Sequence, residues 1–203
     1  DIFFLKSPEK IYKNFKLSNK DVLITKHNYS SQYDKSKTSG KFCVQFLIIN
    51  RKGYDIIKDW ELLCNDWCYD KIEGGKYGDQ KYLDYWPTNY KNRIFIENNR
   101  DAFQGPWNAD STEANNAIVY HFHGLRKITK NFYLFNRGYN IPTNTKIKIY
   151  DLYFNSLKKI ILKYDENLNI LPLSKKNKIS LFLNVVLDHL KFKKNYIIKN
   201  IKR

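Results

Sequence analysis

The sequence is poor in cysteine. Its 203 residues include only 3 cysteines, an odd number, in a chain long enough to bury a core without a disulfide framework. This excludes the small disulfide-stapled class of secreted domains. We therefore expect Cys43, Cys64 and Cys68 to be reduced, packed thiols in a cytoplasmic protein.

The sequence contains no methionine. It opens directly on an apolar segment, residues 1–5, which is typical of the end of a buried strand. Both features lead us to expect a chain that is truncated at its N-terminus. The lack of a signal peptide therefore says nothing about secretion.

Long apolar runs and internal repeats are also missing. No run approaches the roughly 20 residues that a membrane-spanning helix requires. Hydrophobic residues nevertheless make up 42% of the chain and aromatic residues 16%, which argues against disorder. A chain of this length is expected to form one domain with a sizeable core, or most of a larger domain.

Arginine is scarce in a strongly basic chain. The formal net charge is +16, but only six of the 36 basic residues are arginine, the usual residue for two-pronged recognition of bases and phosphates. A surface dominated by lysine is a weak signal for nucleic acid, and we expect no specific nucleic-acid partner. The charge is uneven, since residues 146–203 hold 14 basic and 4 acidic residues. We therefore separate a main portion, residues 1–145, from a basic tail, residues 146–203.

Hydrophobic patterning predicts strands that alternate with helices. Apolar runs predict strands at 1–5, 22–25, 42–50, 94–96 and 117–122. Helical spacing, capping residues and chain breakers predict helices at 8–15, 54–73, 78–86, 151–163 and 179–192. This alternation indicates an α/β fold with a sheet of mixed direction, in which a ligand usually lies at the carboxyl ends of strands.

The last predicted strand ends in residues with distinctive chemistry. Alternation places His121 and His123 on one face, and Gly124 allows a sharp turn and the close approach of a ligand. Arg126 and Lys127 add fixed positive charge. Imidazole, bare backbone and cations are the components of a site for a metal-bound diphosphate. The alternative is a strand end with one packed histidine and two solvated cations.

Four segments occur in an order that is similar to a known family. They are 1–4 (DIFF), 77–87 (YGDQKYLDYWP), 105–108 (GPWN) and 121–126 (HFHGLR). Together they resemble the catalytic and acceptor-side portion of bacterial GT-A glycosyltransferases related to glycosyltransferase family 8. The resemblance implies a GT-A-like mixed sheet flanked by helices, formed by the main portion and followed by a basic helical tail.

The resemblance implies a divalent cation, Mn²⁺ or Mg²⁺, held against the diphosphate of a nucleotide sugar. Asp1 matches the second carboxylate of the family's Asp-x-Asp, whose first carboxylate would precede this chain, and His121 matches a further metal ligand. Gly124 matches the glycine that lets the backbone approach the phosphates. Arg126 stands where the family has lysine, and Lys127 follows it, so both are expected to bind the diphosphate. Such charges stabilise the leaving diphosphate as its negative charge develops.

Other matching residues are expected near the sugar and the acceptor. Asp79 and Gln80 match the family's Asp-Gln and are expected to be catalytic. Asp79 would bind sugar hydroxyls or act as the base of an inverting reaction, and Gln80 would position the sugar or stabilise its positive charge. The alternative for Gln80 is a polar residue that caps a short helix. Trp86, Trp107 and His123 are expected to contact the sugar or the acceptor, and the alternative for each tryptophan is a place in the core.

The chain departs from the family at two places. Segment 42–45 (FCVQ) stands where many relatives carry an Asn-x-Gly element on the acceptor side. The half that would bind the base and ribose of the nucleotide is expected to precede residue 1. The isolated chain is therefore expected to be inactive, whatever the parent protein does.

These features together imply a metal-dependent glycosyltransferase of surface polysaccharide synthesis. It would transfer a sugar from a nucleotide-sugar donor, with UDP-sugars favoured, to a glycan or lipid-linked acceptor. The protein would be cytoplasmic, and its basic tail would contact the inner face of the membrane through helices with apolar faces. The alternative for the tail is packing against the domain with solvated lysines. The alternative function is a non-catalytic basic module whose binding to membranes or polyanions weakens steeply with salt.

Overall fold

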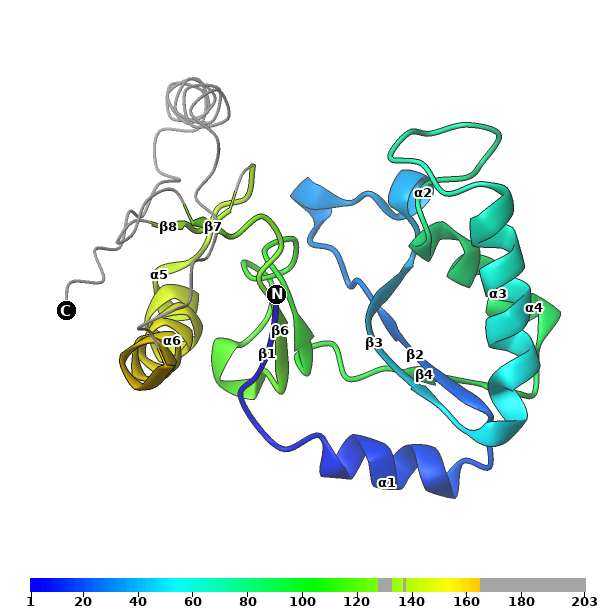
Figure 1. Cartoon of the computed structure of the whole chain (residues 1–203), viewed down its shortest axis with the longest axis horizontal. Helices are drawn as coiled ribbons and strands as arrows, with labels where there is room; N and C mark the ends of the chain where they lie inside the picture. Colours follow the sequence, from blue (N-terminus) through cyan, green and yellow to red (C-terminus); the bar gives the residue numbers. More distant parts are fainter. Residues whose placement is uncertain (128–132, 137, 165–203) are drawn as a thin grey trace.

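The computed structural model describes residues 1–127, 133–136 and 138–164 (Figure 1). The described chain has a mixed α/β structure, which confirms the class expected from the alternation of strands and helices. Its main strands form two separate three-stranded sheets rather than one sheet, and a two-stranded ribbon accompanies them. The helix expected at 179–192 and Arg137 lie outside the described residues.

The first sheet has the order β3-β2-β4. Its strands are β2 (Val22–Lys26), β3 (Phe42–Ile49) and β4 (Ile94–Glu97), with β3 antiparallel and β4 parallel to β2. Its covering helices are α1 (Glu9–Leu17), α3 (Tyr54–Asp66) and α4 (Trp86–Asn89). Successive side chains of β2 point to opposite faces. Val22 and Ile24 therefore pack with α3 and α4, at the right of Figure 1, whereas Leu23 packs with α1.

The second sheet has the order β1-β6-β5, and it pairs the first strand of the chain with a strand from the middle of the sequence. Its strands are β1 (Ile2–Phe4), β6 (Val119–His121) and β5 (Phe103–Gln104), with β1 antiparallel and β5 parallel to β6. Ile2 is paired with His121, and the amide of Phe122 donates to the carbonyl of Asp1 at 2.7 Å. Residue 1 therefore lies directly beside the histidine segment, at the centre of Figure 1.

A helical segment closes the other side of the second sheet. It comprises α5 (Thr143–Thr145), a single π-helical stretch η5 (Lys146–Tyr150) and α6 (Asp151–Tyr164), and it follows the ribbon of β7 (Arg126–Lys127) and β8 (Tyr133–Leu134). Ile149, Tyr150 and Phe154 belong to one buried cluster with Tyr120 and Phe122. The boundary that we expect between the main portion (1–145) and the basic tail (146–203) therefore falls inside this helical segment, which packs on the core. The division into two portions stays a prediction.

Two helices differ from those expected. The helix predicted at 54–73 ends at Asp66, because Trp67 is extended (φ −156°, ψ 119°). Gly74 and Gly75, both with positive φ, instead form the turn of the loop that follows. The helix predicted at 78–86 is a 3₁₀-helix followed by α4, and Pro87 lies in the first turn of α4 instead of ending it. Proline is tolerated there because amides of the first turn have no helical partner.

Several short helices connect the strands. They are η1 (Ser31–Tyr33), α2 (Ser36–Ser39), η2 (Arg51–Gly53), η3 (Gln80–Tyr85) and η4 (Ala114–Asn116). The segment between β2 and β3 contains η1 and α2. Among the described helices, none has the length and apolar character needed to cross a membrane.

Candidate functional site

A pocket of about 120 Å³ lies where the ends of the two three-stranded sheets meet. Its walls come from the loop after β2, α2, the start of β3, the start of η3 and the residues before it, the loop between β5 and η4, the end of β6 and the segment after β8. The lining residues are His27, Tyr29, Lys35, Ser39, Cys43, Tyr77, Gln80, Trp107, His121, His123 and Tyr139. Four of these, Gln80, Trp107, His121 and His123, are residues that the sequence singled out. The structure thus brings them to one place.

Asp1 lies outside the lining of the pocket but makes a polar contact with His121, which belongs to the lining. The pairing of β1 with β6 sets them side by side, with Oδ1 of Asp1 3.1 Å from Nε2 of His121. Burial is the main cause that lowers the pKa of His121 to about 4. The imidazole is therefore neutral at pH 7. A neutral imidazole can bind a cation without first losing a proton.

Trp107 forms the central wall of the pocket. Its side chain is only 4% exposed, and its Nε1–H donates to the carbonyl of His27 at 2.9 Å. The indole contacts three imidazoles edge to face, with centroid distances of 5.3 Å to His27, 5.3 Å to His121 and 6.0 Å to His123. The rings of His121 and His123 are 5.8 Å apart, so the strand alternation did place them on one side. His123 is exposed, whereas His121 is half-buried.

Asn108 braces the loop that carries Trp107. It is fully buried, and its amide donates to the carbonyls of His27 (2.9 Å) and Phe103 (3.2 Å) and accepts from the amide of Gly105 (3.0 Å). A Cβ at Gly105 would stand 2.6 Å from the indole of Trp107, which explains why this position is glycine. The segment 105–108 (GPWN) is one of the four segments that resemble the glycosyltransferase family. Its structural role is to fix the indole against the histidines.

His27 is a pocket residue that the sequence did not reveal. It directly follows β2, and its ring stacks on Tyr29 with a centroid distance of 4.6 Å. Burial, and then the neighbouring His121, lower its pKa to about 4, so it is neutral at pH 7. Nδ1 of His27 and Nδ1 of His121 are buried without a hydrogen-bond partner among the described residues. The available signal was a histidine at the end of a buried strand, the same pattern that drew notice to His121.

The turn after the histidines has the geometry that its glycine predicted. Gly124 has φ +82°, and the amide of Leu125 donates to the carbonyl of Phe122 at 2.9 Å across the turn. Arg126 is exposed, and its Nη1 donates to the carbonyl of Leu125 at 2.9 Å. Lys127 lies in β7, and its side chain lies outside the described part of the structure.

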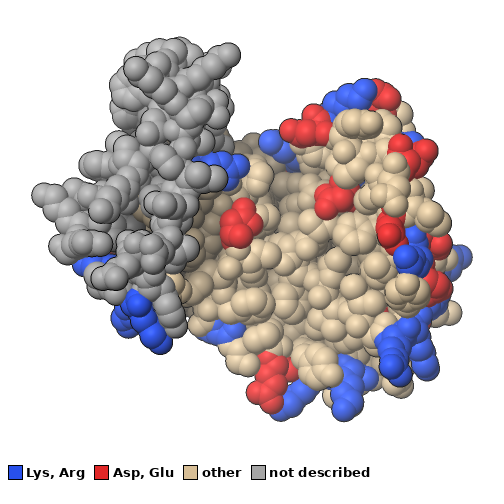
Figure 2. All heavy atoms as spheres, in the orientation of Figure 1, with Lys and Arg blue, Asp and Glu red and all other residues tan. Residues whose placement is uncertain are grey.

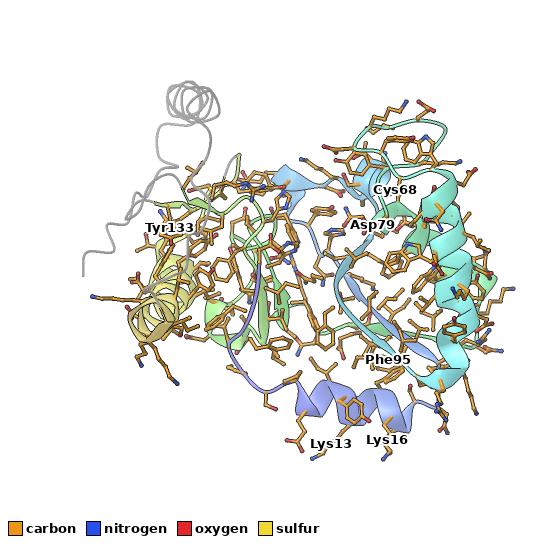
Figure 3. The ribbon with its side chains drawn as sticks, viewed as in Figure 1. Lys13, Lys16, Cys68, Asp79, Phe95 and Tyr133 are labelled. Carbon is orange, nitrogen blue, oxygen red and sulfur yellow. The ribbon has the colours of Figure 1, made fainter. Side chains whose placement is uncertain are left out.

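The Asp-Gln pair is split by the fold. Gln80 lines the pocket, whereas Asp79 is half-buried outside the lining, and its carbonyl accepts from Nε1 of Trp60 at 2.9 Å. Figure 3 shows Asp79 near Cys68, where the loop after α3 passes the first sheet. Trp86 does not reach the pocket. It is 3% exposed and packs edge to face on Trp60 at 5.8 Å, because α4 turns it into the core under the first sheet.

Metal-ligating side chains are few in the described ranges 1–127, 133–136 and 138–164. No group of three or more His, Cys, Asp or Glu side chains there could hold a metal ion. Asp1 and His121 provide one carboxylate oxygen and one imidazole nitrogen. That donor pair suits Mn²⁺ better than a soft, thiolate-binding metal.

The three cysteines should react with alkylating reagents at very different rates. Burial raises the pKa of Cys43 to about 12 and that of Cys64 to about 11, so at pH 8 only roughly one part in ten thousand of Cys43 is the reactive thiolate. Cys68 is exposed. Iodoacetamide at about pH 8 should therefore label Cys68 first, Cys64 more slowly and Cys43 only after unfolding, as followed by mass spectrometry. Cys68→Ser should abolish the fast phase, and rapid labelling of Cys43 in the folded protein would contradict the structure.

Comparison with known proteins gives one distant relative. The chain is 25% identical over 181 residues, 79% of its length, to the Bacillus subtilis (strain 168) protein named "Uncharacterized protein YfnD". It spans only 56% of the length of that protein. No family model matches the chain, and no solved structure matches it.

Proposed function

We propose that this chain is part of a metal-dependent, GT-A-like glycosyltransferase. It would transfer a sugar from a nucleotide-sugar donor, with UDP-sugars favoured, to a glycan or lipid-linked acceptor. The observation that carries the proposal is the Asp1–His121 contact of 3.1 Å, beside a pocket that His121 lines together with Gln80 and Trp107. Asp1 and His121 are far apart in the sequence, and strand pairing alone brings their two ligand atoms together.

The donor side of the reaction needs charge next to the diphosphate. Asp1 and His121 would hold Mn²⁺ or Mg²⁺, with a second carboxylate that the family resemblance puts before residue 1. The ion would stabilise negative charge on the departing nucleoside diphosphate. The positive φ of Gly124 turns the backbone where the phosphates would approach, and exposed Arg126 adds a cation beside that turn, with Lys127 next in sequence.

The pocket has the composition of a sugar subsite. Trp107, Tyr29 and Tyr139 supply aromatic walls on which the apolar face of a pyranose can lie. Gln80 would position the sugar. Asp79 is half-buried outside the lining, so it would serve as a base or hydrogen-bonding partner only if its loop moved toward the pocket.

The proposed setting is synthesis of surface polysaccharide at the inner face of the membrane. The three free thiols fit a reducing compartment, and the proposal therefore puts the protein in the cytoplasm. The basic tail, residues 146–203, would approach anionic lipid. Its first helix, α6, packs on the core through Phe154, so membrane contact would fall to residues beyond Tyr164 or to the outer lysines.

The proposal is tested by UDP binding to the full-length natural protein. We expect calorimetry to show tight UDP binding only with Mn²⁺ present, and His121→Ala to weaken that binding by at least about 100-fold because a side chain that binds the ion directly is lost. Asp1→Ala should have the same effect. Gln80→Ala is the matched comparison: it should keep metal-dependent UDP binding and lower sugar transfer.

Two outcomes would contradict the proposal. One is a folded protein whose UDP binding does not depend on a metal ion. The other is His121→Ala with unchanged binding and an unchanged unfolding temperature. Either result would favour a non-catalytic module that binds polyanions, which is recognised by a steep fall of log affinity with log salt concentration.

A further inference from the structure

A second hollow lies at the opposite end of β2 and β3 from the histidine pocket. Its volume is about 520 Å³, within the range of about 300–1,000 Å³ that is typical of small-molecule sites. We call it the α1 groove, because it opens between α1 and the ends of the two strands. It is lined by Tyr12, Phe15, Lys16, Asn19, Lys20, Asp21, Ile48, Ile49, Asn50, Arg51 and Lys52.

The charge of the α1 groove is strongly positive. Figure 2 shows lysine and arginine side chains gathered at the lower right of the molecule, below the end of the first sheet. The only acidic residue in the lining, Asp21, is already paired, with its Oδ2 2.6 Å from Nε of Arg93. Within the described part of the chain, the side chains of Lys16, Arg51 and Lys52 have no hydrogen bond or ion pair and are exposed. Their charges are therefore available to an anion.

The groove also presents apolar surface to solvent. Tyr12 is 54% exposed and Ile49 is 43% exposed, and Phe15 and Ile48 lie beside them in the lining. A small hydrophilic anion would contact only the cationic side chains and would leave the apolar surface exposed. A ligand with both a charged head and an apolar portion would use the whole surface, and would cover apolar area that water now contacts.

The basic rim is held firmly by the fold. The side chain of Asn50 accepts from the amides of Lys52 (2.8 Å) and Gly53 (3.2 Å), which fixes η2 at the end of β3. A Cβ at Gly53 would stand 2.7 Å from Cγ2 of Val22, so η2 packs closely on the start of β2. At the other side, Lys16 stands near the carboxyl end of α1 (Figure 3). The backbone positions of the cationic residues are thus set before a ligand arrives, while their exposed side chains stay free to turn toward it.

We propose that the α1 groove binds a phosphate ester that carries an apolar chain. The phosphate would lie on Lys16, Arg51 and Lys52, and the chain would lie on Tyr12 and Ile49. The ligand would be the headgroup region of a membrane phospholipid or a free amphiphilic phosphate ester. This site does not depend on the glycosyltransferase proposal, since the groove shares no residue with the histidine pocket.

The probe for this site is octyl phosphate, titrated into the full chain and followed by NMR shifts and calorimetry. We expect saturable binding with shifts at α1 and η2. Inorganic phosphate, which has the charge alone, should bind at least about tenfold more weakly, and octyl glucoside, which has the chain alone, should not bind. Tyr12→Ser should lower the affinity for octyl phosphate but leave the affinity for inorganic phosphate unchanged.

A matched pair of variants separates the groove from general charge. The groove double variant, Lys16→Gln with Arg51→Gln, should bind octyl phosphate at least about tenfold more weakly. The control double variant, Lys58→Gln with Lys71→Gln, removes the same amount of charge from α3 and the following loop. It should leave the affinity for octyl phosphate unchanged. Equal affinity of the two double variants, or octyl glucoside binding as well as octyl phosphate does, would overturn the proposal.

Vesicles distinguish the two sources of the phosphate ester. Vesicles of phosphatidylcholine with about one-third phosphatidylglycerol should bind the groove double variant at least about tenfold more weakly than the control double variant if the source is a bilayer. Equal vesicle binding by the two, together with unequal octyl phosphate binding, assigns the site to a free phosphate ester. Loss of UDP binding in His121→Ala with octyl phosphate binding intact would show that the two sites are independent.

Discussion

Replacement of Trp107 by alanine should lower the free energy of unfolding by about 3–5 kcal/mol, the usual cost of deleting a buried tryptophan. The indole is 4% exposed and contacts His27, His121 and His123. Its removal leaves a cavity that cannot collapse easily, because Asn108 holds the surrounding loop to Phe103 and His27. The loss should be measured by urea unfolding followed by circular dichroism.

The variant should also change the pocket. With the indole gone, the imidazole protons of His121 and His123 should shift in the NMR spectrum. Trp86→Ala is the matched control, because Trp86 is equally buried (3%) but packs under the first sheet. Trp86→Ala should lower the free energy of unfolding by a similar amount and leave the NMR signals of His121 and His123 unshifted. A loss below about 1 kcal/mol for Trp107→Ala would show that the loop repacks, contrary to the buried contacts described above.

The second large effect is expected from Asn108→Asp, a change that keeps size and shape. The amide donates two hydrogen bonds, to carbonyls of His27 and Phe103, which a carboxylate cannot do. The ionised aspartate would face two carbonyl oxygens in a site that is 0% exposed in the native protein. We expect the free energy of unfolding to fall by about 3–5 kcal/mol at pH 7, the cost of an unpaired buried charge.

The effect of Asn108→Asp should depend on pH with a definite sign. Burial beside two carbonyl oxygens raises the pKa of the new carboxyl group in the folded state above its unfolded value. The folded protein therefore binds the proton more tightly, and the loss of stability shrinks as pH falls toward about 4. Asn14→Asp, on the exposed face of α1, is the control and should change stability by less than about 0.5 kcal/mol at any of these pH values. An Asn108→Asp penalty that grows on acidification would contradict this account.

The sequence by itself determined the longer strands and part of the site, but not the two-residue strands β5, β7 and β8. The apolar runs predicted β1, β2, β3, β4 and β6 close to their observed bounds, because buried strands need continuous or alternating apolar residues. Alternation at the end of β6 also predicted that His121 and His123 share a side, and Gly124 predicted the turn after them. These are local properties, which the backbone period and the freedom of glycine set without help from distant residues.

The secondary-structure ends were less predictable. Trp67 continues the apolar spacing of α3, and yet the helix ends before it, because the indole is used in the following loop, edge to face with Tyr69. Pro87 reads locally as a stop, but the first turn of α4 accepts it. The end of α3 is thus decided by a contact made after the chain turns, whereas Pro87 is accepted because first-turn amides have no helical partner.

Only the tertiary structure decided which residues meet. It placed His27 with His121 around Trp107, left Asp79 outside the lining and turned Trp86 into the core. It also joined α1 to η2 in a basic groove that no continuous segment of the sequence contains. The physical reason is that periodicity fixes the face on which a side chain lies, whereas the element that covers this face is chosen by long-range packing and strand pairing.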